Sequence, residues 1–175
     1  MLRRRLWAFA FVLVACVGCD HAAKQMAQQW LGDGGGLSLL GGVVQLQLVA
    51  NPGAFLSLGA GLPEAVRQFV LIGLVPLAVG FVSWLAWRSP GASRAHVVAL
   101  GLVAGGGLAN WLDRVVDDGA VTDFVSLGLG ALRTGIFNLA DLAIVAGLLL
   151  LLRTGTVSPP PTAASGGSGR TRADC

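Results

Sequence analysis

One aspartate lies inside an otherwise apolar stretch of the chain. Asp141 is the only charged residue between Thr134 and Leu152, and an ionised carboxylate in a bilayer core costs about 3 kcal/mol. Such a group is protonated, paired or in contact with water. Asn138 precedes it by three residues, so both side chains share one helical face. The alternative is an interhelical hydrogen bond, which an uncharged side chain makes at lower cost, so the carboxyl group favours chemistry.

A second polar group ends another apolar stretch. Asn110, Asp113 and Arg114 lie on one face of a predicted helix, directly after the glycines at 105–107. Glycines allow another backbone or a ligand to approach closely. Nine residues after Arg114 comes Asp123, in a run rich in β-branched and aromatic residues. Asp123 is a candidate functional acid, and the alternative role for it is in a turn or a cap.

Two further pairs of polar or turn-forming residues occur earlier in the chain. Asp20 and Lys24 are four residues apart, a spacing that allows an ion pair within one helix. Asn51 and Gly53 follow an alternating stretch and indicate a turn. The chain has only two histidines, so a histidine-based metal site or a Ser–His triad has little support.

The composition indicates which elements must position these residues. Only 21 of 175 residues are charged, or 12%, whereas an average soluble domain carries roughly 25%. So few charges cannot cover a water-facing surface, which excludes a soluble globular domain and, for most of the chain, disorder. We assign the net charge of +3 to orientation in a membrane and expect no nucleic-acid partner.

Long charge-poor stretches predict membrane-spanning helices. A hydrocarbon core of about 30 Å needs roughly 20 helical residues. Four stretches fit this length after small extensions, and they predict spans over about 5–26, 67–87, 94–113 and 135–153. The expected fold is a mainly α membrane protein, a four-transmembrane-helix bundle in which residues 1–154 form one membrane domain.

The segments outside the predicted helices differ in character. Residues 27–66 form the longest outer segment, and alternation over 43–49 predicts a strand within a β-rich part at about 37–58. Residues 121–127 form a second strand-like run. We therefore expect a small extracytoplasmic sheet. The tail at 155–175 is rich in Pro, Ser, Gly and Thr and is predicted to be disordered.

The charges predict an orientation. With a cytoplasmic N-terminus, the inner segments carry eight basic residues and the outer segments four, which favours cytoplasmic N- and C-termini. Seven acidic residues, among them Asp113 and Asp123, then fall on or near the outer side, and Asp141 lies in the outer half of its span. Because the orientation rule does not count acids, a functional outer face is one explanation for their position.

The first apolar stretch has a rival interpretation. Leu13 to Cys16 resembles the lipobox of a lipoprotein precursor, and a removable signal peptide is the alternative to a span. Three more spans follow, which an ordinary lipoprotein lacks. Cys16 and Cys19 spell C-x-x-C, but no second pair or histidine cluster accompanies them, which argues against zinc. We interpret them as small residues on a helix face.

Five short motifs occur in one order along the chain. They are Asp20-x-x-x-Lys24, Asn51-x-Gly53-Ala54-Phe55, Asn110-x-x-Asp113-Arg114, Gly119-x-Val121-x-Asp123-Phe124 and Phe137-Asn138-x-Ala140-Asp141. In this combination, over about residues 10–152, the chain resembles bacterial lipoprotein signal peptidase (signal peptidase II). Ala109 stands where that family usually has Gly, and the stretch after Gly53 is a variant of the family pattern Gly-Ala-Ala-Phe-Gly.

The resemblance implies an aspartyl endopeptidase of the bacterial inner membrane with four transmembrane helices and a small outer β-cradle. It implies cleavage of diacylglyceryl-modified prolipoproteins before the lipidated Cys, without metal or cofactor, by a protein whose partners are this substrate and membrane lipids. By matching motifs, the catalytic pair is Asp123 and Asp141. Supporting or substrate-contacting positions are Asn51, Gly53, Asn110, Asp113, Arg114 and Asn138, and structural positions are Asp20 and Lys24. A monomer is expected.

The residue types suit this chemistry. Two carboxyl groups close together do not both ionise easily, so one holds a proton while the other acts as a base. Such a pair titrates as a unit, and the sequence assigns neither role to Asp123 or Asp141 alone. The amides of Asn110 and Asn138 are suited to orient the carboxylates or hold the scissile carbonyl.

Two other classes of protein are alternatives. In a small ion- or proton-coupled transporter or a channel subunit, Asp141 would bind an ion or a proton. A transporter is expected to show paired halves or broken helices, and the sequence indicates neither. The other alternative is a structural membrane protein or lipoprotein anchored through Cys16.

Overall fold

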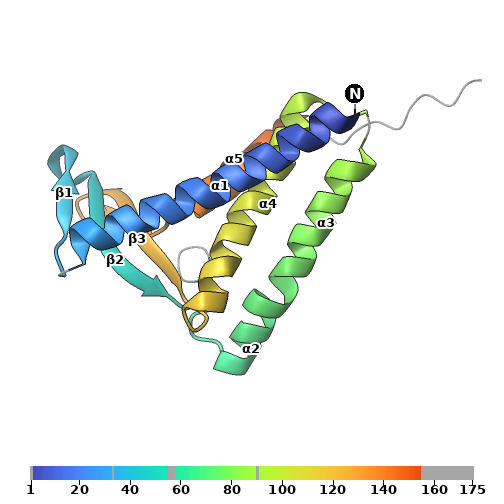
Figure 1. Cartoon of the computed structure of the whole chain (residues 1–175). Coiled ribbons are helices and arrows are strands. Elements are labelled where there is room, and N and C mark those ends of the chain that lie inside the picture. The colour runs from blue at the N-terminus through green and yellow to red at the C-terminus, as the bar shows by residue number, and fades with distance from the viewer. Residues whose placement is uncertain (1, 33, 55–57, 90, 155–175) are drawn as a thin grey trace, which may run out of the picture.

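The computed structural model describes residues 2–32, 34–54, 58–89 and 91–154, which form a helical bundle with one small sheet (Figure 1). The helices are α1 (Leu2–Leu31), α2 (Glu64–Gln68), the π-helical η3 (Phe69–Leu74), α3 (Val75–Arg88), α4 (Arg94–Val116) and α5 (Leu139–Thr154). Because α2, η3 and α3 follow one another directly, they form one long helical segment. The predicted mainly α fold with about four helices and a small sheet is confirmed. The predicted disordered tail at 155–175 lies outside the described residues.

Within the described residues, three helices are long and apolar enough to cross a membrane. They cover Arg3–Leu31, Glu64–Arg88 and Arg94–Val116. The surface of the helices is rich in exposed large apolar side chains, including Trp7, Phe11, Phe69, Leu77, Phe81 and Leu152. Such a surface is stable against lipid tails and not against water.

Helix α5 begins later than the sequence predicts. The expected span started at residue 135, but the helix starts at Leu139 and has 16 residues, about 24 Å at 1.5 Å per residue. The reason is that Phe137 belongs to the sheet. Its N–H donates to the carbonyl of Val125 at 2.9 Å, and its carbonyl accepts from the N–H of Val125 at 2.9 Å. The first four residues of the predicted span, 135–138, therefore precede the helix.

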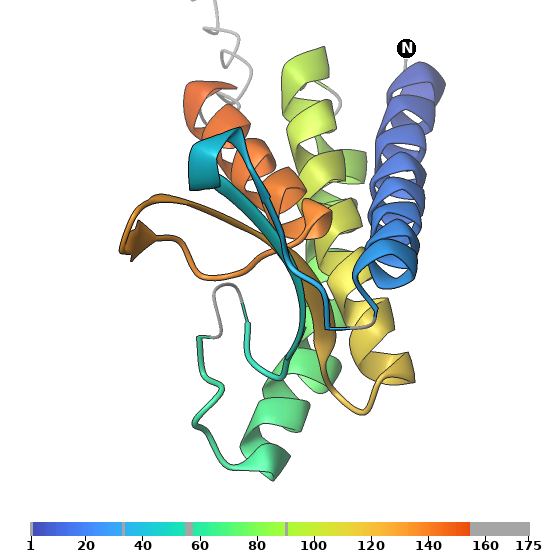
Figure 2. The ribbon, with the colours of Figure 1, turned by 90° about the vertical axis from the view of Figure 1, so that its left-hand side faces the viewer.

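The sheet joins segments that are far apart in the sequence. Its strands lie in the order β1 (Leu37–Leu39), β2 (Val44–Asn51), β3 (Val121–Leu129) and β4 (Leu132–Arg133), all antiparallel. The register of β2 and β3 places Asn51 opposite Val121 and Val49 opposite Asp123. Pairing thus brings the turn after β2 to the start of β3. Figure 2 shows these two strands crossing in front of the helices.

Helix α4 lies at the centre of the bundle, between α3 and the pair formed by α1 and α5 (Figure 1). Its glycines allow this close packing. A Cβ atom at Gly105 would lie 2.9 Å from the carbonyl oxygen of Leu13 in α1, and one at Gly106 would collide with the carbonyl oxygen of Ala140 in α5. The backbones therefore approach more closely than any side chain allows. The glycine patch in the sequence has a packing role on both sides of α4.

Gly106→Ala is expected to destabilise the contact between α4 and α5. The added methyl group would lie 2.8 Å from Cγ1 of Ile144 and closer still to the Ala140 carbonyl, and such overpacking costs about 1–3 kcal/mol. Thermal unfolding in detergent micelles measures the loss. Gly80→Ala in α3 is the matched control, because nothing lies within 4 Å of its added Cβ. Equal unfolding temperatures for the two variants would contradict the packing role.

The ends of the bundle differ. The N-terminal end of α1 and the connection between α3 and α4 lie at one end, and α1 runs from there toward the sheet (Figures 1 and 2). His96, near the start of α4, contacts Thr154 at the end of α5, with 3.2 Å between Nδ1 and Oγ1. The start of α1 and the end of α5 therefore both lie at the end of the bundle opposite the sheet.

Candidate active site

Two buried carboxyl groups meet where the sheet joins α5. Asp123 is 1% exposed on β3, and Asp141 is 5% exposed in the first turn of α5. Asn138 links them. Its Nδ2 donates to Oδ1 of Asp123 at 2.6 Å, and its backbone N–H donates to Oδ2 of Asp141 at 3.4 Å. The structure thus brings together the two aspartates that the sequence analysis selected.

Asn138 also determines where α5 begins. Its Oδ1 accepts a hydrogen bond from the backbone N–H of Asp141 at 2.9 Å, while Asp141 accepts from the backbone of Asn138 in return. This reciprocal pair is a capping box, which satisfies two N–H groups at the helix start. The spacing Asn-x-x-Asp therefore fixes the helix start and the position of the Asp141 carboxyl group together.

The turn after β2 holds the other oxygen of Asp123. Nδ2 of Asn51 donates to Oδ2 of Asp123 at 2.8 Å and to the carbonyl of Ala54 at 3.1 Å. Oδ1 of Asn51 accepts from the N–H of Gly53 at 2.9 Å. Both oxygens of Asp123 thus accept an amide hydrogen bond, and the turn cannot shift without moving the carboxyl group. Phe55, the last residue of this motif, lies outside the described residues.

Helix α4 holds Asp141 through Asn110. Nδ2 of Asn110 donates to Oδ1 of Asp141 at 2.8 Å, and Oδ1 of Asn110 accepts from Nδ2 of Asn138 at 3.0 Å. Three asparagine side chains, from the β2 turn, α4 and the start of α5, therefore surround the two carboxyl groups. Each of them donates an amide hydrogen to a carboxylate oxygen, and the oxygen of Asn110 also accepts from the amide of Asn138.

A cluster of charges lies behind Asn110. Lys24 forms the predicted ion pair with Asp20 at 2.5 Å and a second pair with Asp113 at 2.7 Å. Asp20 also accepts from the backbone N–H of Ala140 at 2.8 Å, next to the candidate acid of α5. This cluster joins α1, α4 and the start of α5 at one point.

Arg114 ties α4 to the β2 turn. Its Nη1 donates to the carbonyl of Asn110 at 3.0 Å and its Nη2 to the carbonyl of Gly53 at 2.5 Å. Its Nε is buried and has no hydrogen-bond partner within the part of the chain that the structure describes. Arg114 and Asp113 therefore have different partners, although they are adjacent in the sequence.

All the residues selected from the sequence lie in this one site or directly behind it. Several contacts escaped sequence analysis, among them two that come from backbone N–H groups. The N–H of Ala140 is held by Asp20, and the N–H of Thr122 donates to Asp113 at 3.4 Å. Backbone donors carry no sequence signal, since any residue supplies one.

Comparison with known proteins gives the family. The sequence profile of the family described as Signal peptidase (SPase) II matches residues 12–156. The chain belongs to the signal peptidase II family.

Several lipoprotein signal peptidases are relatives of this chain. The one from Leifsonia xyli subsp. xyli is 40% identical over 149 residues, which cover 81% of this chain and 64% of that protein. The one from Bifidobacterium longum (strain DJO10A) is 31% identical over 157 residues, which cover 86% and 80%. The one from Beijerinckia indica subsp. indica is 39% identical over 102 residues, which cover 58% and 59%. The chain thus spans less than two thirds of the Leifsonia and Beijerinckia proteins.

The fold is shared with a solved bacterial membrane enzyme. Its structure, obtained by the in meso method at 1.9 Å resolution, superposes with a TM-score of 0.69 at 21% identity. The match covers 83% of this chain and 90% of that one. Membership of the signal peptidase II family, together with the three helices among the described residues that are long and apolar enough to span a bilayer, makes the chain a multi-pass bacterial membrane protein, as predicted.

The environment of Asp123 favours the protonated form of its carboxyl group. Burial raises the pKa of Asp123 from 3.8 to about 6, and the neighbouring Asp141 carboxylate acts in the same direction. The amides of Asn51 and Asn138 and the charge of Lys24 oppose this shift by favouring the carboxylate. A carboxyl group that titrates near neutral pH is suited to exchange protons with a substrate.

Asp123→Asn is expected to flatten the pH dependence of stability. Because the folded state raises the pKa of Asp123 from 3.8 to about 6, this group's stabilising contribution is complete below the lower value. It is lost as the pH rises through the higher one. The unfolding temperature of the original chain should therefore fall more steeply than that of the variant between about pH 4 and pH 7. Parallel curves would contradict the raised pKa.

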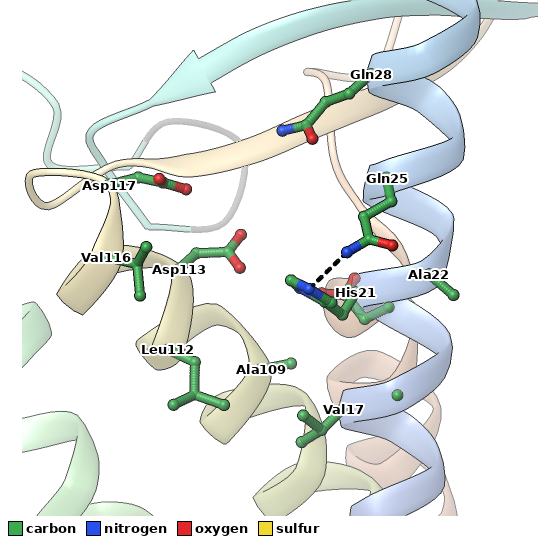
Figure 3. Close-up of a pocket in the computed structure, with 12 residues that line it drawn as sticks. Val17, His21, Ala22, Gln25, Gln28, Ala109, Leu112, Asp113, Val116 and Asp117 are labelled. Atoms are coloured by element: carbon green, nitrogen blue, oxygen red, sulfur yellow. Dashed lines mark hydrogen bonds between the residues drawn. The ribbon is translucent and has the colours of Figure 1, made fainter.

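Two hollows lie beside the elements that carry the site. One, of about 540 Å³, lies between α1 and α4, and Figure 3 shows His21, Gln25 and Asp113 pointing into it. Its lining includes Asp20 and Asp113, the two carboxylates that pair with Lys24. The other, of about 430 Å³, is largely apolar and is lined by Trp30, Phe124 and eight other residues. Phe124 follows Asp123 directly in β3, and successive side chains of a strand point to opposite faces, so this hollow lies on the face of β3 opposite the Asp123 carboxyl group.

Proposed function

We propose that this protein is an aspartyl endopeptidase that removes signal peptides from diacylglyceryl-modified prolipoproteins by cutting before the lipidated Cys. One observation carries the proposal: Asn138 holds the buried carboxyl groups of Asp123 and Asp141 together at the start of α5. Membership of the signal peptidase II family supports the same activity. Asp123 and Asp141 are the proposed catalytic residues.

The two carboxyl groups activate water and protonate the leaving group. One carboxylate accepts a proton from the water, whose oxygen attacks the carbonyl carbon of the scissile bond. The other carboxyl group, still protonated, donates to the substrate, and the amine leaves protonated as the C–N bond breaks. Since close carboxyl groups share their protons, the pair titrates as a unit with two apparent pKa values. The residues named here need no metal or cofactor for these steps.

The supporting residues keep the pair of carboxyl groups in place. Asn51, Asn110 and Asn138 fix the directions of the carboxylate oxygens through amide hydrogen bonds. Arg114 fixes the Gly53 turn beside the site. Amide groups that are held in place before the substrate binds can stabilise developing charge in a dry site.

We further propose how the chain lies in the bacterial inner membrane. Residues 1–154 form the peptidase domain, α5 is a fourth span beside the three longer helical segments, and both termini are cytoplasmic. The distribution of basic residues, eight inside against four outside, supports this orientation. The sheet is then an extracytoplasmic β-cradle and the carboxyl pair lies near the outer face. The substrate's lipid tails lie against the apolar helix surface, and the protein acts as a monomer.

Cleavage of a defined peptide tests the proposal. The purified chain is incubated with a precursor peptide that carries a diacylglyceryl-modified Cys, and the products are identified by mass spectrometry. We expect one cut, directly before the modified Cys. The same peptide with an unmodified Cys is the control and should be cut much more slowly. Absence of cleavage, or a cut elsewhere, would overturn the proposed function.

A further inference from the structure

Lys24 makes two ion pairs and, in addition, a hydrogen bond to a residue of the site. Its ammonium group is buried, with the residue 3% exposed, and it pairs with Asp20 at 2.5 Å and with Asp113 at 2.7 Å. Two carboxylates already compensate one buried ammonium charge. The third contact, 3.2 Å from Nζ to Oδ1 of Asn110, points toward the carboxyl pair. This contact joins an ion cluster to the site.

The third contact determines how the Asn110 amide is turned. Lys24 has only donors, so the atom of Asn110 that faces it must be the oxygen. The same oxygen accepts from Nδ2 of Asn138 at 3.0 Å, which leaves Nδ2 of Asn110 to donate to Asp141 at 2.8 Å. If the amide turned over, its NH₂ group would face two donors and its oxygen would face a carboxylate. Lys24 therefore favours the one orientation that serves Asp141.

We propose that Lys24 is a positioning residue of the peptidase reaction, which aims the Asn110 amide at Asp141 and supplies a positive charge beside the carboxyl pair. This inference rests on the proposed function, because it concerns the same site. It assigns to Lys24 an effect on the reaction in addition to the structural role that the resemblance implies.

The charged groups around the pair come from four elements. They are Asp20 and Lys24 on α1, Asp113 and Arg114 on α4, Asp123 on β3 and Asp141 on α5. The charge of Lys24 lowers the pKa of Asp123 against the effect of burial. Removing this charge therefore raises the pKa of Asp123. Because the two carboxyl groups titrate together, both limbs of the pH–rate profile should move to higher pH.

Three substitutions at Lys24 separate its two contributions. Lys24→Met removes the donor and the charge, Lys24→Gln keeps a donor without the charge, and Lys24→Arg keeps both. We expect Lys24→Met to lower kcat by about 10- to 100-fold, the usual value of a hydrogen bond to a charged group, with KM little changed. Lys24→Gln should recover part of kcat but keep the pH shift. Lys24→Arg should recover both.

A second measurement does not depend on activity. Infrared difference spectroscopy follows protonation of Asp123 in the original chain and in Lys24→Met, with Asp123→Asn to identify the band. We expect the midpoint to move to higher pH in Lys24→Met. If the original chain cut no peptide while the midpoint moved, the proposed function would be wrong and the charge effect of Lys24 would stand. An unchanged midpoint would overturn the inference.

The matched control loosens the same pair of helices away from the site. A Cβ atom at Gly101 of α4 would lie 3.0 Å from Cβ of Val12 and 3.3 Å from the carbonyl of Phe9 in α1. Gly101→Ala should therefore lower the unfolding temperature without moving the pH–rate profile. If Lys24→Met also lowered only stability, with an unchanged profile and full activity per folded molecule, Lys24 would be structural and the inference would fail.

Discussion

Asparagine in place of either Asp123 or Asp141 should reduce cleavage of the lipid-modified peptide by about 10²- to 10⁴-fold, the range that positioned acids and bases contribute. Asparagine has nearly the same size and neither accepts nor donates a catalytic proton. The paired arrangement predicts that both substitutions are severe, because each carboxyl group needs the other in the opposite protonation state. Initial rates measured over a range of pH test this.

Both variants should remain folded, with a measurable loss of stability. Each oxygen of Asp123 accepts from an amide, Asn51 on one side and Asn138 on the other. An asparagine at 123 offers one oxygen and one NH₂ group, so one contact becomes donor against donor, at a cost of about 1–3 kcal/mol. Thermal unfolding in detergent therefore accompanies every rate.

Asp118→Asn is the matched control for these two substitutions. Asp118 is an exposed acid five residues before Asp123, and its backbone has φ 47°, a conformation that Asn also tolerates. It should cleave at the original rate. Retained turnover by either Asp123→Asn or Asp141→Asn, in protein of normal stability, would remove that residue from the catalytic pair.

Asn138→Ala is expected to have the second largest effect, because one side chain serves both the helix start and the carboxyl pair. Its loss removes the cap of α5, worth about 1 kcal/mol. It also removes the amide that donates to Asp123 and to Asn110. A carboxyl group that moves by about 1 Å lowers the rate about 100-fold. Activity and unfolding temperature should therefore both fall.

Asn138→Ser separates the two effects. Serine is as good a helix cap as asparagine, so the unfolding temperature should recover. Its shorter side chain cannot also reach Asp123, so the rate should stay low. A serine variant with full activity, or an alanine variant that cleaves normally per folded molecule, would show that the amide bridge plays no part in the reaction.

Part of this site could be predicted from the sequence. Asp141 was detectable because a carboxyl group in an apolar stretch is costly, and Asn138 because it lies one helical turn earlier. The role of Asp123 depended on the family resemblance, since an aspartate in a strand-like run equally suits a turn. The strand-like runs at 43–49 and 121–127 were each visible, but their register was not. That register places Asn51 beside Asp123.

Other parts could not be predicted because they depend on contacts between distant elements. The start of α5 was placed four residues early, since the apolar residue Phe137 suits a helix or a strand and pairs with Val125 in the structure. The contact between Lys24 and Asn110 requires α1 and α4 to pack at glycine distance. Periodicity indicates that a helix has an apolar face but does not identify the helix that covers it.

A single turnover in H₂¹⁸O tests the central claim most directly. The purified chain, in excess over a diacylglyceryl-modified precursor peptide, cuts it once in labelled water, and mass spectrometry locates the label. Because the carboxyl pair acts on water, we predict one ¹⁸O atom in the new carboxyl group of the released signal peptide, which ends directly before the modified Cys. Asp123 and Asp141 should remain unlabelled. A signal peptide without ¹⁸O, with the label found instead in either aspartate, would contradict the account.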